Sequence, residues 1–160
     1  MKAPFKIKDK VIHKREGLSE IVSYTKISEK DYFLLKALRG DGEVIYVPIE
    51  GCENIIRPIM SSKDALELLK YMKGISLEIN SNTKQRRDAY KKMLNTGDIN
   101  DIAYLSRQLY CYKLSENQDK LGPMDIEMLS RAHNMLMDEF MVVFKKPKDK
   151  IEAYIEKKIG

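Results

Sequence analysis

The sequence predicts an α+β protein, with a β-rich domain over residues 1–60 followed by an all-α domain over residues 61–160. A change of pattern near residue 60 supports this division. Before it, short β-rich runs are separated by turn residues, with no helical spacing between them. After Arg57-Pro58, hydrophobic residues recur at intervals of three and four, as in amphipathic helices. A chain of 160 residues can bury the cores of one or two such domains without disulfides or metal.

The first domain contains four or five predicted strands. They are expected within residues 5–12, 21–27, 32–38 and 43–49. Gly40-Asp41-Gly42 predicts a tight turn between the last two of these runs. Pro48 has no N–H group and is expected at a strand edge or end. Short strands without intervening helices favour a small barrel of the SH3 or Tudor kind, and an open antiparallel sheet is the alternative.

The second domain contains five predicted helices. They are expected at about 61–74, 84–94, 98–112, 122–144 and 151–159, with a linker over 75–83. Ser61 and Asp98 are predicted N-caps, and Pro123 is tolerated in a first turn. The fourth helix is expected to bury one stripe, which consists of Met124, Met128, Ala132, Met135 and Leu136.

Charge and composition exclude several classes of protein. With 29 basic and 24 acidic side chains the formal net charge is only +5, so contact with nucleic acid must come from local clusters. Apolar runs are too short to span a membrane. The first residues lack the apolar core of a signal peptide, so an intracellular protein is expected. Cys52 and Cys111 form no C-x-x-C motif and are expected to be reduced thiols.

The sequence contains no recognisable catalytic or metal-binding motif. His13 and His133 lie in different predicted domains, away from Cys or carboxylates at ligand spacing, so His133 is interpreted as a surface or packing residue. Asp138 and Glu139 are adjacent on a helix, point about 100° apart and are interpreted as solvated surface. We therefore expect a protein that is not an enzyme and has no metal, cofactor or small-molecule substrate. A catalytic cluster assembled only by folding is the remaining route to an enzyme.

One basic cluster is a candidate nucleic-acid site at the start of the second predicted helix. Its cations are Lys84, Arg86, Arg87, Lys91 and Lys92, with Asp88 among them. Helix N-terminal N–H groups and Arg side chains both favour phosphate. Taken alone, such a run is more often a solvated helix face.

The order of motifs in the first domain resembles the CarD/CdnL transcription regulators. The similar segments are 5–12, Gly17, 20–22, 32–36, 47–49, 53–55 and 57–59. The same module is the RNA-polymerase-interacting domain of the transcription-repair coupling factor. The likeness continues in 97–99, 102–103, 105–110, Leu129, Ala132, Leu136 and Glu139, which resemble the helical C-terminal domain of CarD. The resemblance thus covers nearly the whole chain and excludes the repair helicase.

The resemblance implies a Tudor-like domain that docks on the polymerase β subunit. It also implies a helical domain that contacts promoter DNA near the upstream edge of the melted region and stabilises the open complex in the bacterial cytoplasm. On this basis the polymerase contacts are expected at Lys26, Ile27, Ile45, Tyr46 and Val47. Strand alternation by itself instead places Ile45 and Val47 in buried packing and Tyr46 outward.

The sequence departs from the family at a tryptophan that usually acts as a wedge in the minor groove. This chain has no tryptophan. Counting back from Leu94 places Thr83 at the corresponding position, whereas a shift of one residue would instead align Arg86-Arg87 with the arginine pair of the family. Without an apolar wedge, we expect DNA contact to be largely contact with the backbone and independent of sequence. The alternative hypothesis is a protein-interaction adaptor that binds polymerase or another partner and leaves DNA alone.

Overall fold

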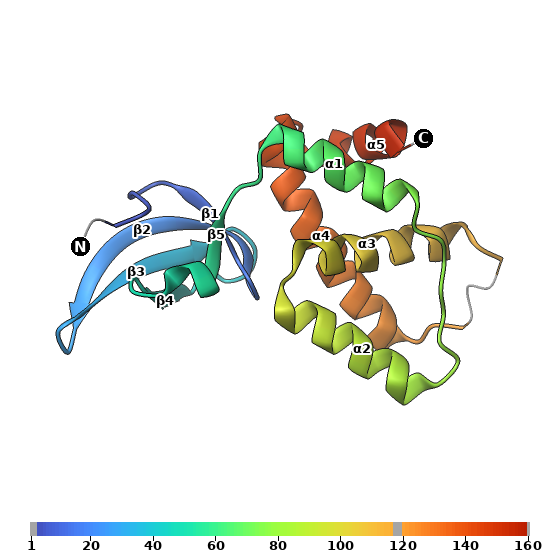
Figure 1. The fold of residues 1–160 in the computed structure, drawn as a ribbon, viewed down its shortest axis with the longest axis horizontal. Coiled ribbons are helices and arrows are strands. Elements are labelled where there is room, and N and C mark those ends of the chain that lie inside the picture. The colour runs from blue at the N-terminus through green and yellow to red at the C-terminus, as the bar shows by residue number, and fades with distance from the viewer. Residues whose placement is uncertain (1–2, 117–119, 160) are drawn as a thin grey trace. The chain divides into compact units, whose positions relative to one another are not determined.

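The computed structural model describes residues 3–116 and 120–159, and the chain divides into two compact units, Met1–Ile59 and Met60–Gly160. The first unit is built around an antiparallel sheet and the second from helices (Figure 1). The predicted α+β class is therefore confirmed. No helix among the described residues is both long and apolar enough to cross a bilayer.

The sheet of the first unit has five strands in the order β4-β3-β2-β1-β5. The strands are β1 Lys10–His13, β2 Gly17–Ile27, β3 Lys30–Ala37, β4 Val44–Pro48 and β5 Ile56–Pro58, with a 3-10 helix, η1 Cys52–Asn54, before β5. In the described residues, β4 and β5 form the two ends of the sheet and do not pair with each other. The prediction of a small SH3- or Tudor-like barrel is confirmed in part: the five-stranded antiparallel sheet is consistent with a Tudor-like domain, but the barrel is not closed, as in the alternative of an open sheet.

The two faces of the sheet differ in burial because side chains alternate along each strand. The register pairs Phe33 with Val47, and both side chains are buried on the inner face. The inner core of this unit consists of Val11, Ile21, Phe33, Leu35, Val47, Cys52 and Ile56. On the outer face Leu34 pairs with Tyr46, whose side chain is 53% exposed. The sheet therefore has one packed face and one face with exposed apolar groups.

The second unit contains α1 Ser62–Lys73, α2 Thr83–Thr96, α3 Ile99–Leu114, α4 Pro123–Phe144 and α5 Lys148–Ile159. Side chains cap the first three helices. Ser61 Oγ accepts a hydrogen bond from Asp64 N at 3.1 Å, and Asp98 Oδ1 accepts one from Asn100 N at 2.9 Å. Asn82 Oδ1 accepts one from Gln85 N at 3.0 Å, so α2 begins one residue earlier than expected. The predicted caps Ser61 and Asp98 are confirmed.

The buried stripe of α4 lies on a different face from the predicted one. Its buried residues are Asp125, Leu129, Ala132, Leu136, Met137, Glu139 and Phe140. Met124 is 48% exposed, and Met128 and Met135 are only half-buried. The prediction counted methionines as core residues, but the helix turns Asp125 and Glu139 inward instead, where both have polar partners. Only Ala132 and Leu136 of the predicted stripe are fully buried.

The expected linker between α1 and α2 is held against the helical core. Ile75, Leu77 and Ile79 alternate along an extended segment and pack on the core of the unit. The amide of Gln108, a buried residue of α3, donates to Ser76 O and accepts from Glu78 N, both at 2.8 Å. These hydrogen bonds satisfy backbone carbonyl and N–H groups of a segment that has no regular secondary structure in which to pair them.

Candidate functional site

The cations of the basic cluster on α2 do not share one environment, and Arg86 is buried. Only 5% of Arg86 is exposed. Its guanidinium donates to both carboxylate oxygens of Asp125, at 3.0 and 2.8 Å, and to Asn80 O at 2.9 Å. A guanidinium that is buried and paired in this way cannot hold a DNA phosphate. We therefore correct the prediction and remove Arg86 from the candidate nucleic-acid surface.

Helical spacing explains why Arg86 points inward. Tyr90 and Met93 follow it at intervals of four and three residues, so the three side chains lie on one face of α2. Tyr90 is buried and Met93 packs against the helical core. The same spacing can be seen in the sequence, and it would have predicted that Arg86 lies on the buried face of α2 while the other cations do not.

Asp125 links the start of α2 to the start of α4. Besides Arg86, it accepts a hydrogen bond from Gly122 N at 2.9 Å and so also caps α4. Burial raises the pKa of the Asp125 carboxyl, but the hydrogen bonds from Arg86 and Gly122 and the charges of Arg86 and Arg87 outweigh it, so the pKa lies below the usual range. The same pairing raises the pKa of Arg86. The pair is therefore ionised at neutral pH.

Arg87 is partly committed to the same structural site. Its Nε lies 3.5 Å from Asp125 Oδ1, and 30% of its side chain is exposed. A Cβ atom at position 122 would lie only 3.2 Å from an Arg87 guanidinium nitrogen, so Gly122 makes room for this arrangement. Arg87 can offer a phosphate only part of its guanidinium.

The lysines of the cluster form its exposed part. Lys84, Lys91 and Lys92 are exposed, and at about 100° per residue they lie within one third of the circumference of α2, opposite Arg86. Asp88 is exposed on the same face and offsets part of their charge. Thr83 is exposed in the first turn of α2. This surface can hold phosphates as point charges, but it offers no apolar wedge.

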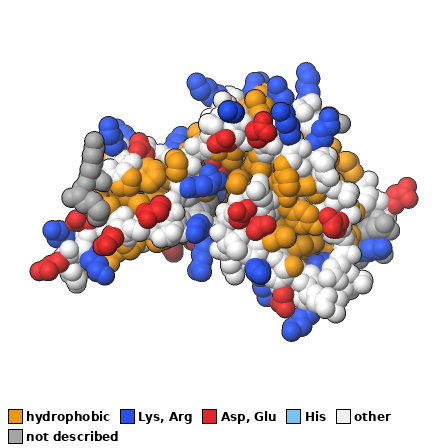
Figure 2. All heavy atoms as spheres, in the orientation of Figure 1, with side chains coloured by type: hydrophobic (Ala, Val, Ile, Leu, Met, Phe, Trp, Pro, Cys, Tyr) orange, Lys and Arg blue, Asp and Glu red, His pale blue; other side chains and the backbone are white. Residues whose placement is uncertain are grey.

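Charges on the face of the protein drawn in Figure 2 do not form a single basic surface. On the face drawn in Figure 2, Lys and Arg side chains are interspersed with acidic ones over both units. This agrees with the small formal net charge of +5. Any contact of this chain with nucleic acid therefore depends on local groups such as the lysines of α2.

The sheet register divides the five expected polymerase contacts between two faces. Ile45 and Val47 alternate with Tyr46, and Val47 is only 1% exposed while Ile45 packs on the inner core. The side chain of Val47 therefore cannot contact a partner without unfolding the sheet, which corrects that part of the prediction. The interpretation from strand alternation is confirmed for Ile45, Tyr46 and Val47.

Tyr46 and Ile27 lie on the outer face, with exposures of 53% and 45%. The ring of Tyr46 packs edge-on against Tyr32, with the centroids 6.5 Å apart. Lys26 is exposed near the end of the β2–β3 hairpin, on the opposite side of the strand from Ile27. In the described residues β4 pairs only with β3, so its other edge is open. This unit thus offers an apolar outer face and a free strand edge beside it.

Sequence reasoning misjudged one acidic residue and left the partners of one histidine unidentified. Glu139 is 1% exposed and accepts a hydrogen bond from Met60 N at 2.8 Å, so it is not solvated surface. His133 Nδ1 lies 2.9 Å from Ser106 Oγ, and its Nε2 bonds to Glu152 at 2.5 Å. His133 therefore links three helices, in agreement with a packing role. The described residues contain no group of three or more His, Cys, Asp or Glu side chains suited to a metal ion.

Two families match this chain. Residues 67–156 match the family described as CarD, C-terminal domain. Residues 5–60 match the CarD-like/TRCF RID domain. The matches together span both structural units, and the first one alone covers more than half of the chain.

We predict that replacing Arg86 by Met destabilises the helical unit by about 3–5 kcal/mol, because it leaves the buried Asp125 carboxylate without its main partner. The matched control is Lys91→Met on the exposed face of α2, which should change the free energy of unfolding by less than about 0.5 kcal/mol. Urea unfolding followed by circular dichroism measures both. Equal effects of the two substitutions would contradict a structural role for Arg86.

The lowered pKa of Asp125 predicts that the free energy of unfolding of the protein decreases at acid pH. A carboxyl with a depressed folded-state pKa adds stability above its unfolded pKa of about 3.9, and this stability is lost as the pH falls through the folded pKa. Unfolding free energies measured between pH 6 and pH 3 should therefore fall less steeply for Asp125→Asn than for the unchanged protein. Asp88→Asn, on the exposed face of α2, should leave the slope as it is. An unchanged slope in Asp125→Asn would show that Asp125 is not the titrating group.

Proposed function

This chain belongs to the CarD family, and from that membership we propose that it is a transcription regulator that binds the β subunit of RNA polymerase. In this proposal residues 1–60 dock on polymerase, and residues 61–160 contact the backbone of promoter DNA and modulate the stability of the open complex. The protein acts in the bacterial cytoplasm, and polymerase and promoter DNA are its partners.

The observation that supports DNA contact is the exposure of Lys84, Lys91 and Lys92 on one face of α2. The Arg86–Asp125 pair fixes the opposite face of the helix, so the lysines are presented by a helix that is held in place. Ammonium groups on a helix surface can neutralise phosphates without reading bases. Arg87 joins this set with the exposed part of its side chain.

Polymerase docking is supported by the sheet. Tyr46 and Ile27 are large, exposed apolar residues on the outer face, and aromatic side chains are frequent anchors in interfaces. The free edge of β4 can pair with a strand of a partner. Lys26 lies at the rim of this area, where a charge contributes mainly to the rate of association. Ile45 supports the surface from below, by packing on the inner core.

The adaptor remains the second candidate, and a specific observation favours it. Arg86 is buried and Asp88 lies among the exposed lysines, so the cluster offers less positive charge than its sequence suggests. An adaptor would use the docking surface of the sheet in the same way, but its α2 would stay clear of DNA.

We predict that Tyr46→Asp lowers the affinity of the full chain for purified RNA polymerase at least tenfold, because it places a charge where an aromatic ring would be buried. Lys14→Glu is the control, since Lys14 is exposed in the turn between β1 and β2. Binding can be followed by interferometry with the polymerase immobilised. If Tyr46→Asp binds like the control, the outer face of the sheet is not the docking surface.

We predict that changing Lys84, Lys91 and Lys92 together to Glu removes the effect of the protein on open-complex lifetime while polymerase binding is retained. If each lysine contacts one phosphate, the slope of the logarithm of the DNA-binding constant against the logarithm of the salt concentration should also become shallower by about 1 for each lysine changed. The matched control changes Lys63, Lys70 and Lys73 of α1, which are exposed and carry the same charge.

The two candidate functions differ in the outcome of this experiment. A loss of the lifetime effect in the α2 variant alone supports DNA contact. An unchanged lifetime effect in the α2 variant contradicts it and leaves the adaptor. An equal loss in the α1 control would mean that overall charge matters and that α2 has no special part.

A further inference from the structure

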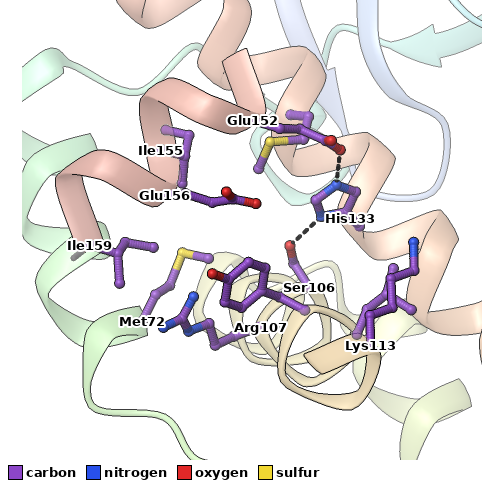
Figure 3. A pocket seen from close by; sticks show the side chains of 12 residues that line it. Met72, Ser106, Arg107, Lys113, His133, Glu152, Ile155, Glu156 and Ile159 are labelled. Carbon is purple, nitrogen blue, oxygen red and sulfur yellow. Dashed lines mark hydrogen bonds and ion pairs between the residues drawn. The ribbon is translucent and has the colours of Figure 1, made fainter. Parts of the chain in front are cut away.

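The helical unit contains a cavity that the proposed function does not use. It has a volume of about 110 Å³ and lies among α1, α3, α4 and α5 (Figure 3). Its apolar wall is formed by Met72, Leu109, Met137, Ile155 and Ile159. Its polar groups come from α3, α4 and α5. A small apolar cavity with a few polar groups converging on it is the usual form of a ligand site.

Most of the polar groups around this cavity already have partners within the protein. Ser106, His133 and Glu152 form a chain of hydrogen bonds that crosses from α3 through α4 to α5, drawn as dashed lines in Figure 3. Lys113, at the edge of the cavity, also interacts with another residue. These groups stabilise the walls and leave little capacity for a ligand.

Arg107 and Glu156 differ from these groups because each has a polar group without a hydrogen-bond partner among the described residues. The Nε of Arg107 is buried and has no hydrogen-bond acceptor among the described residues, while the guanidinium stacks on the ring of Tyr110 at 4.5 Å. A buried N–H donor without an acceptor is costly, so it points to an acceptor brought by something else. Glu156 is an exposed residue of α5 and forms no hydrogen bond or ion pair with any other described residue. In Figure 3 its carboxylate points into the cavity from α5, opposite Arg107 on α3.

From these contacts we propose that the cavity binds a small zwitterion, an α-amino acid with an apolar side chain. The carboxylate of the amino acid accepts from Arg107, and its ammonium group donates to Glu156. The apolar side chain lies against Met72, Ile155 and Ile159. Glu156 is exposed and hydrated, so it does not need a ligand, but its negative charge would repel a simple anion from the cavity. A simple cation would leave Arg107 Nε without an acceptor. An α-amino acid pairs with both groups.

The size of the cavity agrees with this class of ligand. One water needs a cavity of about 10–15 Å³, so a cavity of about 110 Å³ has room for a small molecule. A small amino acid such as leucine, isoleucine or methionine is of this kind, whereas a nucleotide is much larger. The inference rests on the helical unit alone and holds whether or not the chain binds DNA or polymerase.

The test uses methionine methyl groups as reporters in the full-length protein. Met72 and Met137 line the cavity, and Met124 is exposed at the start of α4, away from it. With methyl-13C methionine in the protein, leucine titrated to about 20 mM should shift the Met72 and Met137 signals in a saturable manner. The Met124 signal should not move. 4-Methylpentanoate and isoamylamine are leucine without its ammonium group and without its carboxylate, respectively, and each should bind at least about tenfold more weakly.

Two variants test the two charges. Arg107→Met and Glu156→Gln should each lower the affinity for leucine about tenfold or more, with a control at Lys157→Gln, which is exposed on α5 outside the cavity. Glu156 is itself exposed, so its replacement keeps the test valid if Arg107→Met fails to fold. The proposal is overturned if leucine gives no saturable shift, or if either half-ligand binds as well as leucine. It is also overturned if Glu156→Gln binds leucine like the control.

Discussion

The buried ion pair between Arg86 and Asp125 is the interaction on which the arrangement of the helical unit depends. Removing both charges from water is costly, and the cost is offset only when hydrogen bonds satisfy the buried groups. Here the guanidinium bonds to both carboxylate oxygens and to Asn80 O, while the carboxylate also caps α4 through Gly122 N. The pair therefore fixes the start of α2 against the start of α4. Because the pair buries one face of α2, it also determines which face of the helix is exposed to solvent.

The consequence is a division of roles within one short basic run. In this run Arg86 is buried in an ion pair, and Arg87 is partly exposed beside the same carboxylate. The three lysines, Lys84, Lys91 and Lys92, are exposed. The sheet shows a similar division. Side chains alternate along β4, so Val47 lies in the core while its neighbour Tyr46 is exposed on the outer face. In both units the same elements that build the core determine the composition of the exposed surface.

Much of the fold could be predicted from the sequence, because caps, turns and periodicity are local signals. Ser61, Asp98 and the glycine turn after β3 gave element boundaries close to those observed. Closure of the sheet could not be predicted, since β4 and β5 follow each other closely in sequence but lie at opposite ends of the sheet, and strand alternation carries no signal for whether those two ends pair. The burial of Arg86 and Glu139 was missed because charged residues are usually exposed, and their partners lie 39 and 79 residues away. Neither the cavity nor the unsatisfied Arg107 Nε has any signal in the sequence, since four helices must pack before they exist.

In the proposed function, a polymerase-bound protein places the lysines of α2 against the promoter backbone. A footprint of RNA polymerase on promoter DNA, with and without the protein, tests this placement most directly. We expect the protein to extend or strengthen protection at the upstream edge of the melted region, and we expect the added protection to fade as salt is raised. A footprint identical in the two cases, at protein concentrations that saturate polymerase, would contradict it.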